Sequence, residues 1–249
     1  MPQFEATDPA KLFDISYLHA NGTKEDIESA TKIAREMEAY GVVMHGDDLK
    51  TVVPLLENSS VKPSVVISFP DGRAGWRAKY NEAKQAGENG AVGLDPVVNL
   101  FHVLERNRIR ILYECMLLRE GFLEGTLVGR YPEIKLISQI PYLWTLSNGK
   151  DLIRWLIDLL PEVGVFCIKD WTTRQNFSPD IKLATLVDDR VAYTTFMKDY
   201  IEKQKLNLLI KIAGGITPET APALVEAGAD ILGISAHRAT GIREALLKR

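Results

Sequence analysis

Short runs of apolar residues alternate along this chain with longer segments in which apolar residues recur at helical spacing. Runs rich in Val, Ile and Leu are typical of strands buried on both faces, and apolar positions three and four apart are typical of amphipathic helices. The pattern predicts eight strands, at residues 11–16, 40–44, 64–68, 91–95, 134–140, 163–169, 207–212 and 230–235.

Helical segments separate these strands, and region 97–133 is long enough for two helices. Strands that alternate with helices indicate βαβ units and a parallel sheet. Eight such units close a (β/α)8 TIM barrel, and the chain length of 249 residues suits that fold. We therefore predict an α/β protein with one barrel domain over residues 1–249, and an open doubly wound sheet is the alternative.

Composition narrows the class of protein. The chain is 46% hydrophobic and 25% charged, which is ordinary for a globular protein. With 30 basic and 33 acidic residues and no polybasic block, neither nucleic acid nor an anionic membrane is an expected partner. We expect no secretory signal, because the first residues have no positive stretch followed by an apolar one, and no membrane span, because no apolar run is long enough. Cys115 and Cys167 are the only cysteines, so we expect no disulfide framework. We expect a cytoplasmic protein.

Two of the predicted strands have a lysine at the last or the next-to-last position. In "VGVFCIK" and "NLLIKI", Lys169 and Lys211 alternate with a set of wholly apolar positions, which should face the helices. Both lysines are therefore predicted to point into the barrel, at the carboxyl end of the strands where barrel enzymes carry their active sites. Asp95, at the end of "AVGLD", is predicted to point inward as well, above the small residue Gly93.

Two lysines on neighbouring strands suggest a specific chemistry. Two unit charges about 4 Å apart repel by roughly 4 kcal/mol at an effective dielectric of about 20, which would lower one lysine pKa from about 10.4 toward 7. A neutral amine is a nucleophile that forms a Schiff base with a carbonyl, and an inward carboxylate can relay protons. A single lysine at a strand end is more often a surface residue or half of an ion pair. The combination of Lys169, Lys211 and Asp95 favours the catalytic interpretation.

The loops after the last two strands, "IAGGIT" and "LGISAH", contain Gly214, Gly215, Gly233 and Ser235. That corner of a barrel commonly binds phosphate through backbone amides, although glycines also make tight turns with no ligand. The four histidines have no metal-ligand spacing, so we predict neither a metal nor a cofactor.

The segments "AKYNEAKQAGENGAVGLDPVVN", "CIKDWTT", "IKIAGGITPETAPALVEAGADILGIS" and "SFPDG" resemble deoxyribose-phosphate aldolase and its relatives, the class I aldolases of the DeoC/LacD type. The resemblance runs from about Asp14 to Arg243. It implies a metal-free barrel in which Lys169 forms the Schiff base, Lys211 lowers its pKa, and Asp95 and Asp14 belong to the proton-relay network.

The same resemblance implies the reversible cleavage of 2-deoxy-D-ribose 5-phosphate, or a related small phosphorylated sugar, to acetaldehyde and glyceraldehyde 3-phosphate. Its phosphate would be bound by Gly214, Gly215, Gly233, Ser235 and Thr173. Related thiolases, aldolases of other phosphorylated ketoses and a non-catalytic barrel that binds a phosphorylated metabolite are the alternatives. We expect a small phosphorylated sugar or aldehyde as the ligand and a homo-oligomer, a dimer, as the assembly.

The chain departs from the family pattern directly after Lys169. The family usually has small hydroxyl residues and a glycine there, as in "KTSTG", whereas this chain has Asp170, Trp171, Thr172 and Thr173. An aspartate and an indole next to the Schiff-base lysine are expected to narrow the pocket and to change its charge. A glutamate is also usual after strand five, where this chain has Gln139.

Overall fold

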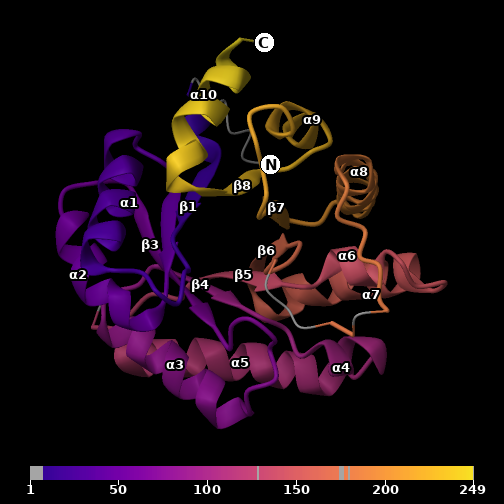
Figure 1. Ribbon diagram of the computed structural model, residues 1–249. Helices are drawn as coiled ribbons and strands as arrows, with labels where there is room; N and C mark the ends of the chain where they lie inside the picture. The colour runs from indigo at the N-terminus through magenta and orange to yellow at the C-terminus, as the bar shows by residue number, and fades with distance from the viewer. Residues whose placement is uncertain (1–7, 128, 174–176, 179, 249) are drawn as a thin grey trace.

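The computed structural model describes residues 8–127, 129–173, 177–178 and 180–248. Eight parallel strands pair in chain order, and the last pairs with the first, so that they close one barrel. Figure 1 shows the helices arranged around this barrel. The predicted (β/α)8 fold is confirmed, and the open doubly wound alternative is wrong. The strands are β1 Phe13–Ser16, β2 Gly41–Met44, β3 Lys62–Ile67, β4 Gly93–Pro96, β5 Glu133–Ile137, β6 Val165–Lys169, β7 Leu209–Ala213 and β8 Ile231–Ser235.

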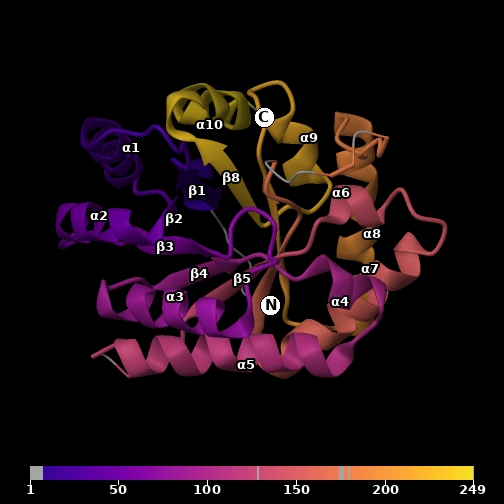
Figure 2. The ribbon, with the colours of Figure 1, turned by 60° about the horizontal axis from the view of Figure 1, so that its bottom comes forward.

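The helices follow the predicted order, and region 97–133 contains two of them, α4 and α5. Figure 2 shows α3 and α5 lying along each other on one side of the barrel. Together with the 3-10 turns, the helices are η1 Pro9–Leu12, α1 Lys24–Glu36, η2 Gly46–Asp48, α2 Leu49–Leu55, α3 Trp76–Glu88, α4 Leu100–Leu104, α5 Arg108–Gly125, α6 Ile140–Leu143, α7 Gly149–Leu159, η3 Leu160–Val163, α8 Val187–Gln204, α9 Ala221–Glu226, η4 Ala236–Arg238 and α10 Ala239–Leu247.

The hydrophobic core lies between the strands and the ring of helices. Ile168 on β6 and Ile210 and Ile212 on β7 have no exposed surface and belong to this core. These are the wholly apolar positions that the strand pattern assigns to the helix side, so the alternation predicted for both strands is present. None of the helices in the described part of the chain is long and apolar enough to cross a membrane.

Strand β5 ends earlier than the sequence pattern predicts. Its last residue is Ile137, and two residues later Gln139 adopts the left-handed conformation, with φ 55°, at the start of α6. A residue with positive φ cannot continue a strand. The apolar run from 134 to 140 therefore belongs to two elements, and periodicity alone does not separate them.

Candidate active site

Five ionisable side chains from five strands are buried inside the barrel, and we call them the interior cluster. None is more than 5% exposed. The four side chains predicted as catalytic are all present, together with a third lysine that the sequence analysis did not identify. The interior cluster consists of Asp14 on β1, Asp95 on β4, Lys135 on β5, Lys169 on β6 and Lys211 on β7.

Asp95 connects all three lysines. Its Oδ2 atom lies 3.0 Å from the Nζ atom of Lys169 and 2.8 Å from that of Lys211. Its Oδ1 atom lies 3.3 Å from the Nζ atom of Lys135. Lys169 and Lys211 are also directly opposite each other in the β6–β7 pairing. The two amines are therefore close neighbours that share one carboxylate oxygen, as the strand pattern predicted.

Asp14 pairs with the other two lysines. Its Oδ2 atom lies 2.5 Å from Nζ of Lys211 and 2.8 Å from Nζ of Lys135. The neighbouring strand makes room for this carboxylate with a glycine, because a Cβ atom on Gly41 would lie 2.8 Å from Oδ1 of Asp14. Lys135 and Lys211 each pair with both aspartates, whereas among the described residues Lys169 pairs with Asp95 alone.

The pKa values of the two carboxylates and of Lys169 are shifted by different causes. Burial acts to raise the pKa of Asp95 and Asp14, but Lys135 and Lys211 outweigh it and hold both pKa values below the ordinary range. For Lys169, burial and then the charge of Lys211 lower the pKa, against the opposing effect of Asp95. The direction agrees with the repulsion argument from sequence, although burial is the larger cause.

Lys135 could have been found by the argument that identified Lys169 and Lys211. It lies in the apolar run "IKLISQI" and alternates with Leu136 in the same way. Its Nζ atom also donates to Oγ of Ser64, at 3.0 Å. The predicted strand 134–140 places Lys135 near its amino end, away from the expected site, whereas in the structure β5 ends at Ile137 and Lys135 is the third of its five residues, as Lys211 is in β7.

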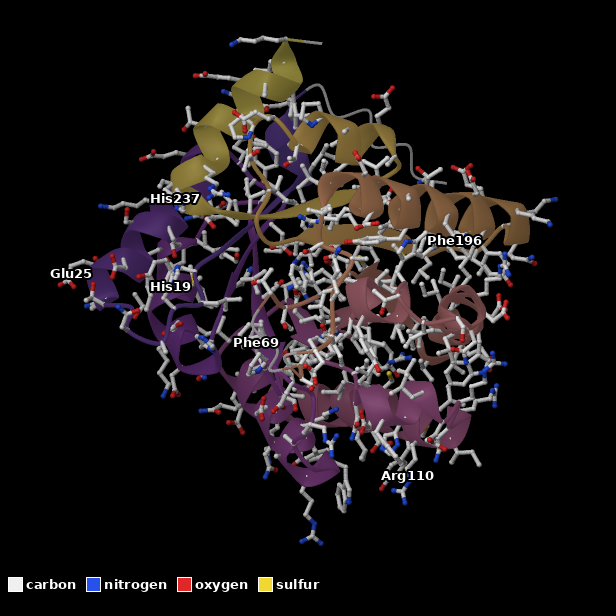
Figure 3. The ribbon with its side chains drawn as sticks, turned by 45° about the vertical axis from the view of Figure 1, so that its right-hand side comes forward. His19, Glu25, Phe69, Arg110, Phe196 and His237 are labelled. Atoms are coloured by element: carbon white, nitrogen blue, oxygen red, sulfur yellow. The ribbon has the colours of Figure 1, made fainter. Side chains whose placement is uncertain are left out.

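A cavity of about 150 Å³ opens beside Lys169. Figure 3 shows two residues of its wall, Phe69 near the centre of the view and His19 toward α1, while Arg110 and Phe196 lie out on the surrounding helices. All five residues predicted to bind phosphate line this cavity together with Lys169: Thr173, Gly214, Gly215, Gly233 and Ser235.

The wall of the cavity contains three residues with positive φ, from two loops. Gly214 and Gly215 have φ of 76° and 66°, and Thr173 has φ of 63° at the position where the family pattern has glycine. A β-branched residue is rare in this conformation, which costs of order 1–3 kcal/mol. The Thr173 methyl group packs on Gly214, where a Cβ atom would approach to 1.9 Å.

The two residues after Lys169 have separate positions. Trp171 lines the cavity, as expected for a residue that narrows it. Asp170 has no exposed surface and is bonded to Arg190 and Tyr193 of α8. The expectation that Asp170 recharges the pocket is therefore wrong, because its carboxylate is directed away from the cavity and neutralised by Arg190.

Among the described residues, no three His, Cys, Asp or Glu side chains are grouped as metal ligands. The interior cluster offers a buried amine with a lowered pKa, a carboxylate bonded to it, and a cavity lined by that amine. Lys169 is the last residue of β6, and barrel enzymes carry their active sites at the carboxyl ends of the strands.

Comparisons with known proteins specify the family. No family model matches the chain. The deoxyribose-phosphate aldolase of Mycoplasmopsis synoviae is 30% identical over 228 residues, which cover 90% of this chain and 92% of that protein. The deoxyribose-phosphate aldolase of Methanothermobacter thermautotrophicus is 27% identical over 230 residues, covering 91% and 90%. The chain belongs to the deoxyribose-phosphate aldolase family, and the predicted enzyme class, a lyase, is confirmed.

Solved structures give the same result for the fold. The structure described as "QR15, an Aldolase" is 26% identical, with a TM-score of 0.75 over 98% of this chain and 97% of that one. A tetrameric deoxyribose phosphate aldolase from Aeropyrum pernix is 24% identical, with a TM-score of 0.73 over 96% and 90%.

Proposed function

We propose that the protein is a class I aldolase whose Lys169 forms a Schiff base with 2-deoxy-D-ribose 5-phosphate or a related small phosphorylated sugar. The products are acetaldehyde and glyceraldehyde 3-phosphate, and the reaction is reversible. The observation that carries this proposal is the position of Lys169, a buried amine with a lowered pKa beside both Asp95 and the cavity. The names of the relatives support the choice of substrate.

The proposed cleavage starts when the neutral amine of Lys169 adds to the C1 aldehyde of the open-chain sugar. Loss of water gives an iminium ion, which accepts electrons from the C2–C3 bond as the C3 hydroxyl loses its proton. Glyceraldehyde 3-phosphate leaves, and the enamine that remains is protonated at C2 and hydrolysed to acetaldehyde. Asp95, directly or through water, is the proposed proton relay.

The other members of the interior cluster have supporting roles in this proposal. Lys211 disfavours the protonated form of Lys169, and Asp14 holds Lys211 at 2.5 Å. Lys135 bonds both carboxylates and so keeps them ionised and oriented. The residues assigned to the phosphate are Thr173, Gly214, Gly215, Gly233 and Ser235, all in the wall of the same cavity.

Trapping with borohydride tests the Schiff base. The protein is incubated with acetaldehyde or with 2-deoxyribose 5-phosphate, reduced, digested and analysed by peptide mass mapping. The adduct is expected on Lys169 and is expected to disappear in Lys169→Met, while Lys32→Met, which removes an exposed lysine of α1, retains it. Absence of any adduct on Lys169 with either carbonyl compound would falsify the proposal.

We also propose that the protein forms a dimer in the cytoplasm. Exposed apolar side chains on α4 and α5, with Phe101 53%, Met116 50% and Ile109 77% exposed, support self-association. Sedimentation equilibrium tests the assembly, and a single species with the mass of one chain at micromolar concentration contradicts it.

A further inference from the structure

Asp170 is the centre of a second buried group of polar side chains, which we call the Asp170 cluster: Asp170, Arg190 and Tyr193. The Oδ2 atom of Asp170 accepts hydrogen bonds from the Tyr193 hydroxyl at 2.8 Å and from Nη2 of Arg190 at 3.3 Å. Its Oδ1 atom accepts from the backbone N–H of Ala213 at 2.8 Å and from that of Trp171 at 2.9 Å. The carboxylate is thus bonded on both oxygens and has no exposed surface.

The cluster is bonded to the loop that follows β7. Arg190 donates to the carbonyl oxygen of Ala213 at 2.9 Å and to that of Gly214 at 2.8 Å. The indole N–H of Trp171 donates to the Ala213 carbonyl as well, at 3.0 Å. Both backbone polar groups of Ala213, and the carbonyl of Gly214, are therefore fixed by side chains from outside the loop.

This arrangement has a geometric consequence for the cavity. A trans peptide is planar, and its C=O and N–H groups point in opposite directions. When Arg190 holds the Gly214 carbonyl, the N–H of Gly215 points away from Arg190. Gly215 lines the cavity, and nothing lies within 4 Å of the place where its Cβ atom would be.

The loop does not hold this conformation by sequence preference alone. Two successive glycines are free to adopt many backbone conformations, since glycine populates positive and negative φ about equally. The N–H of Gly214 already donates to the Gly233 carbonyl at 3.2 Å, so the amide left for an anion is that of Gly215. This amide can bind an anion tightly only if it is already oriented, because ordering the loop on binding reduces the affinity. The Asp170 cluster supplies that order from β6 and α8.

We propose that Asp170, Arg190 and Tyr193 are positioning residues that orient the peptide between Gly214 and Gly215, so that its N–H binds the phosphate group of the substrate whose carbonyl reacts at Lys169. The proposal rests on the proposed function for the role of Lys169. One of the three residues, Asp170, stands where the family pattern has a small hydroxyl residue.

Two measurements separate this role from plain stabilisation. The first is the dissociation constant of inorganic phosphate, by isothermal titration calorimetry on the full chain. The second is the yield of the borohydride-reduced acetaldehyde adduct on Lys169, which involves no phosphate. The variants are Tyr193→Phe, which removes one hydrogen bond and keeps the ring, and Asp170→Asn, which removes the charge.

Tyr200→Phe is the matched control. It removes a tyrosine hydroxyl from the same helix, α8, but that hydroxyl bonds Asp158 on the outer face, at 2.9 Å. Phosphate is expected to bind this control and the wild type equally. Phosphate binding is expected to weaken at least about threefold in Tyr193→Phe and about tenfold or more in Asp170→Asn, as loss of hydrogen bonds around a charged group predicts. The acetaldehyde adduct is expected to change by much less.

Three results would overturn the positioning role: no phosphate binding by the wild type, unchanged phosphate binding in both Tyr193→Phe and Asp170→Asn, or equal losses of phosphate binding and adduct. If Asp170→Asn does not fold, Tyr193→Phe decides alone. If the wild type binds phosphate but forms no acetaldehyde adduct, the proposed aldolase reaction is refuted. The role of the Asp170 cluster is then tested by comparing phosphate binding by the wild type and the two variants.

Discussion

The interior cluster and the Asp170 cluster are both buried and ionic, but their charges balance differently. The interior cluster brings three lysines to two carboxylates, so it has one amine more than it can pair. The Asp170 cluster pairs one guanidinium with one carboxylate and adds a neutral phenol. A buried excess of one cation favours loss of a proton, whereas a balanced pair favours a fixed geometry.

The two clusters contain adjacent residues: Lys169 belongs to the interior cluster and Asp170 to the Asp170 cluster. Lys169 is the last residue of β6 and points into the barrel, whereas Asp170 points outward to α8. Side chains alternate between the faces of a strand, so a single step along the chain separates the proposed nucleophile from the carboxylate proposed to orient the phosphate loop. The comparison predicts that substitutions in the interior cluster alter reactivity and that those elsewhere do not.

Lys169→Met is expected to have the largest effect on activity. Loss of the nucleophile should lower kcat/KM for 2-deoxyribose 5-phosphate by at least about a thousandfold. The pKa of Lys169 is lowered in the fold, so below its unfolded pKa the protonated amine opposes folding, and its removal should not lower the free energy of unfolding at pH 7. Steady-state kinetics and urea denaturation measure both quantities, and a large loss of stability would mean that Lys169 is a structural ion-pair member.

Asp14→Asn tests whether the carboxylates stabilise the excess of lysines. The variant leaves Lys211 and Lys135 with one anion fewer, which should lower the free energy of unfolding at pH 7 by about 3–5 kcal/mol. Burial acts to raise the pKa of Asp14, but Lys135 and Lys211 hold it below 3.8, so its stabilisation is present above about pH 4 and is lost as the pH falls further.

Urea denaturation of wild type and Asp14→Asn at pH 7, 5 and 3 measures this dependence. The difference between the two proteins should shrink on acidification. A difference that grows toward pH 3 would contradict the assignment of Asp14 as an ionised partner of the lysines.

Lys211→Leu changes the charge excess directly. With one cation removed, the pKa of Lys169 should rise, and the pH–rate profile should move in the alkaline direction by about one to three pH units. Activity at pH 7 should fall about tenfold or more, because less of the amine is neutral. Lys62→Leu, which removes a half-buried lysine paired with Glu133 at the start of β3 and β5, is the control and should leave the profile in place.

Asp8→Asn is expected to have the smallest effect. Asp8 pairs with Arg243 of α10, and this bond lowers its pKa from 3.8 to about 2. Both side chains are about a third exposed or more, so solvent screens the pair and its loss should cost less than about 1 kcal/mol. The stabilisation is present above about pH 4 and declines toward pH 2. Thermal unfolding measures it, and kcat/KM should not change.

Much of the fold and part of the site could be predicted, because the alternation of side chains along each strand shows which residues face the helices and which face the barrel interior. The apolar positions of β6 and β7 fixed which way Lys169 and Lys211 point, and pairing of adjacent strands brought them together. The same alternation predicts that Lys135 points inward, but the predicted strand 134–140 runs three residues beyond the observed end of β5 and so places Lys135 too far from the carboxyl end.

The Asp170 cluster could not be predicted in this way. Arg190 and Tyr193 lie about twenty residues further along the chain, on a helix whose face toward β6 is not evident in its mixed sequence. Thr173 adopts the left-handed conformation although it is not glycine, because the surrounding packing overrides its local preference. Both features depend on tertiary contacts rather than on sequence pattern.

The bond between Lys211 and Asp14 joins residues 197 positions apart. Asp14 lies on the first strand and Lys211 on the seventh, so a ribosome has to release nearly the whole polypeptide before these two groups meet. Contacts of such long sequence separation form late and slowly. The surroundings that lower the pKa of Lys169, its burial and the charge of Lys211, therefore arise only in a chain that has been synthesised at least as far as β7.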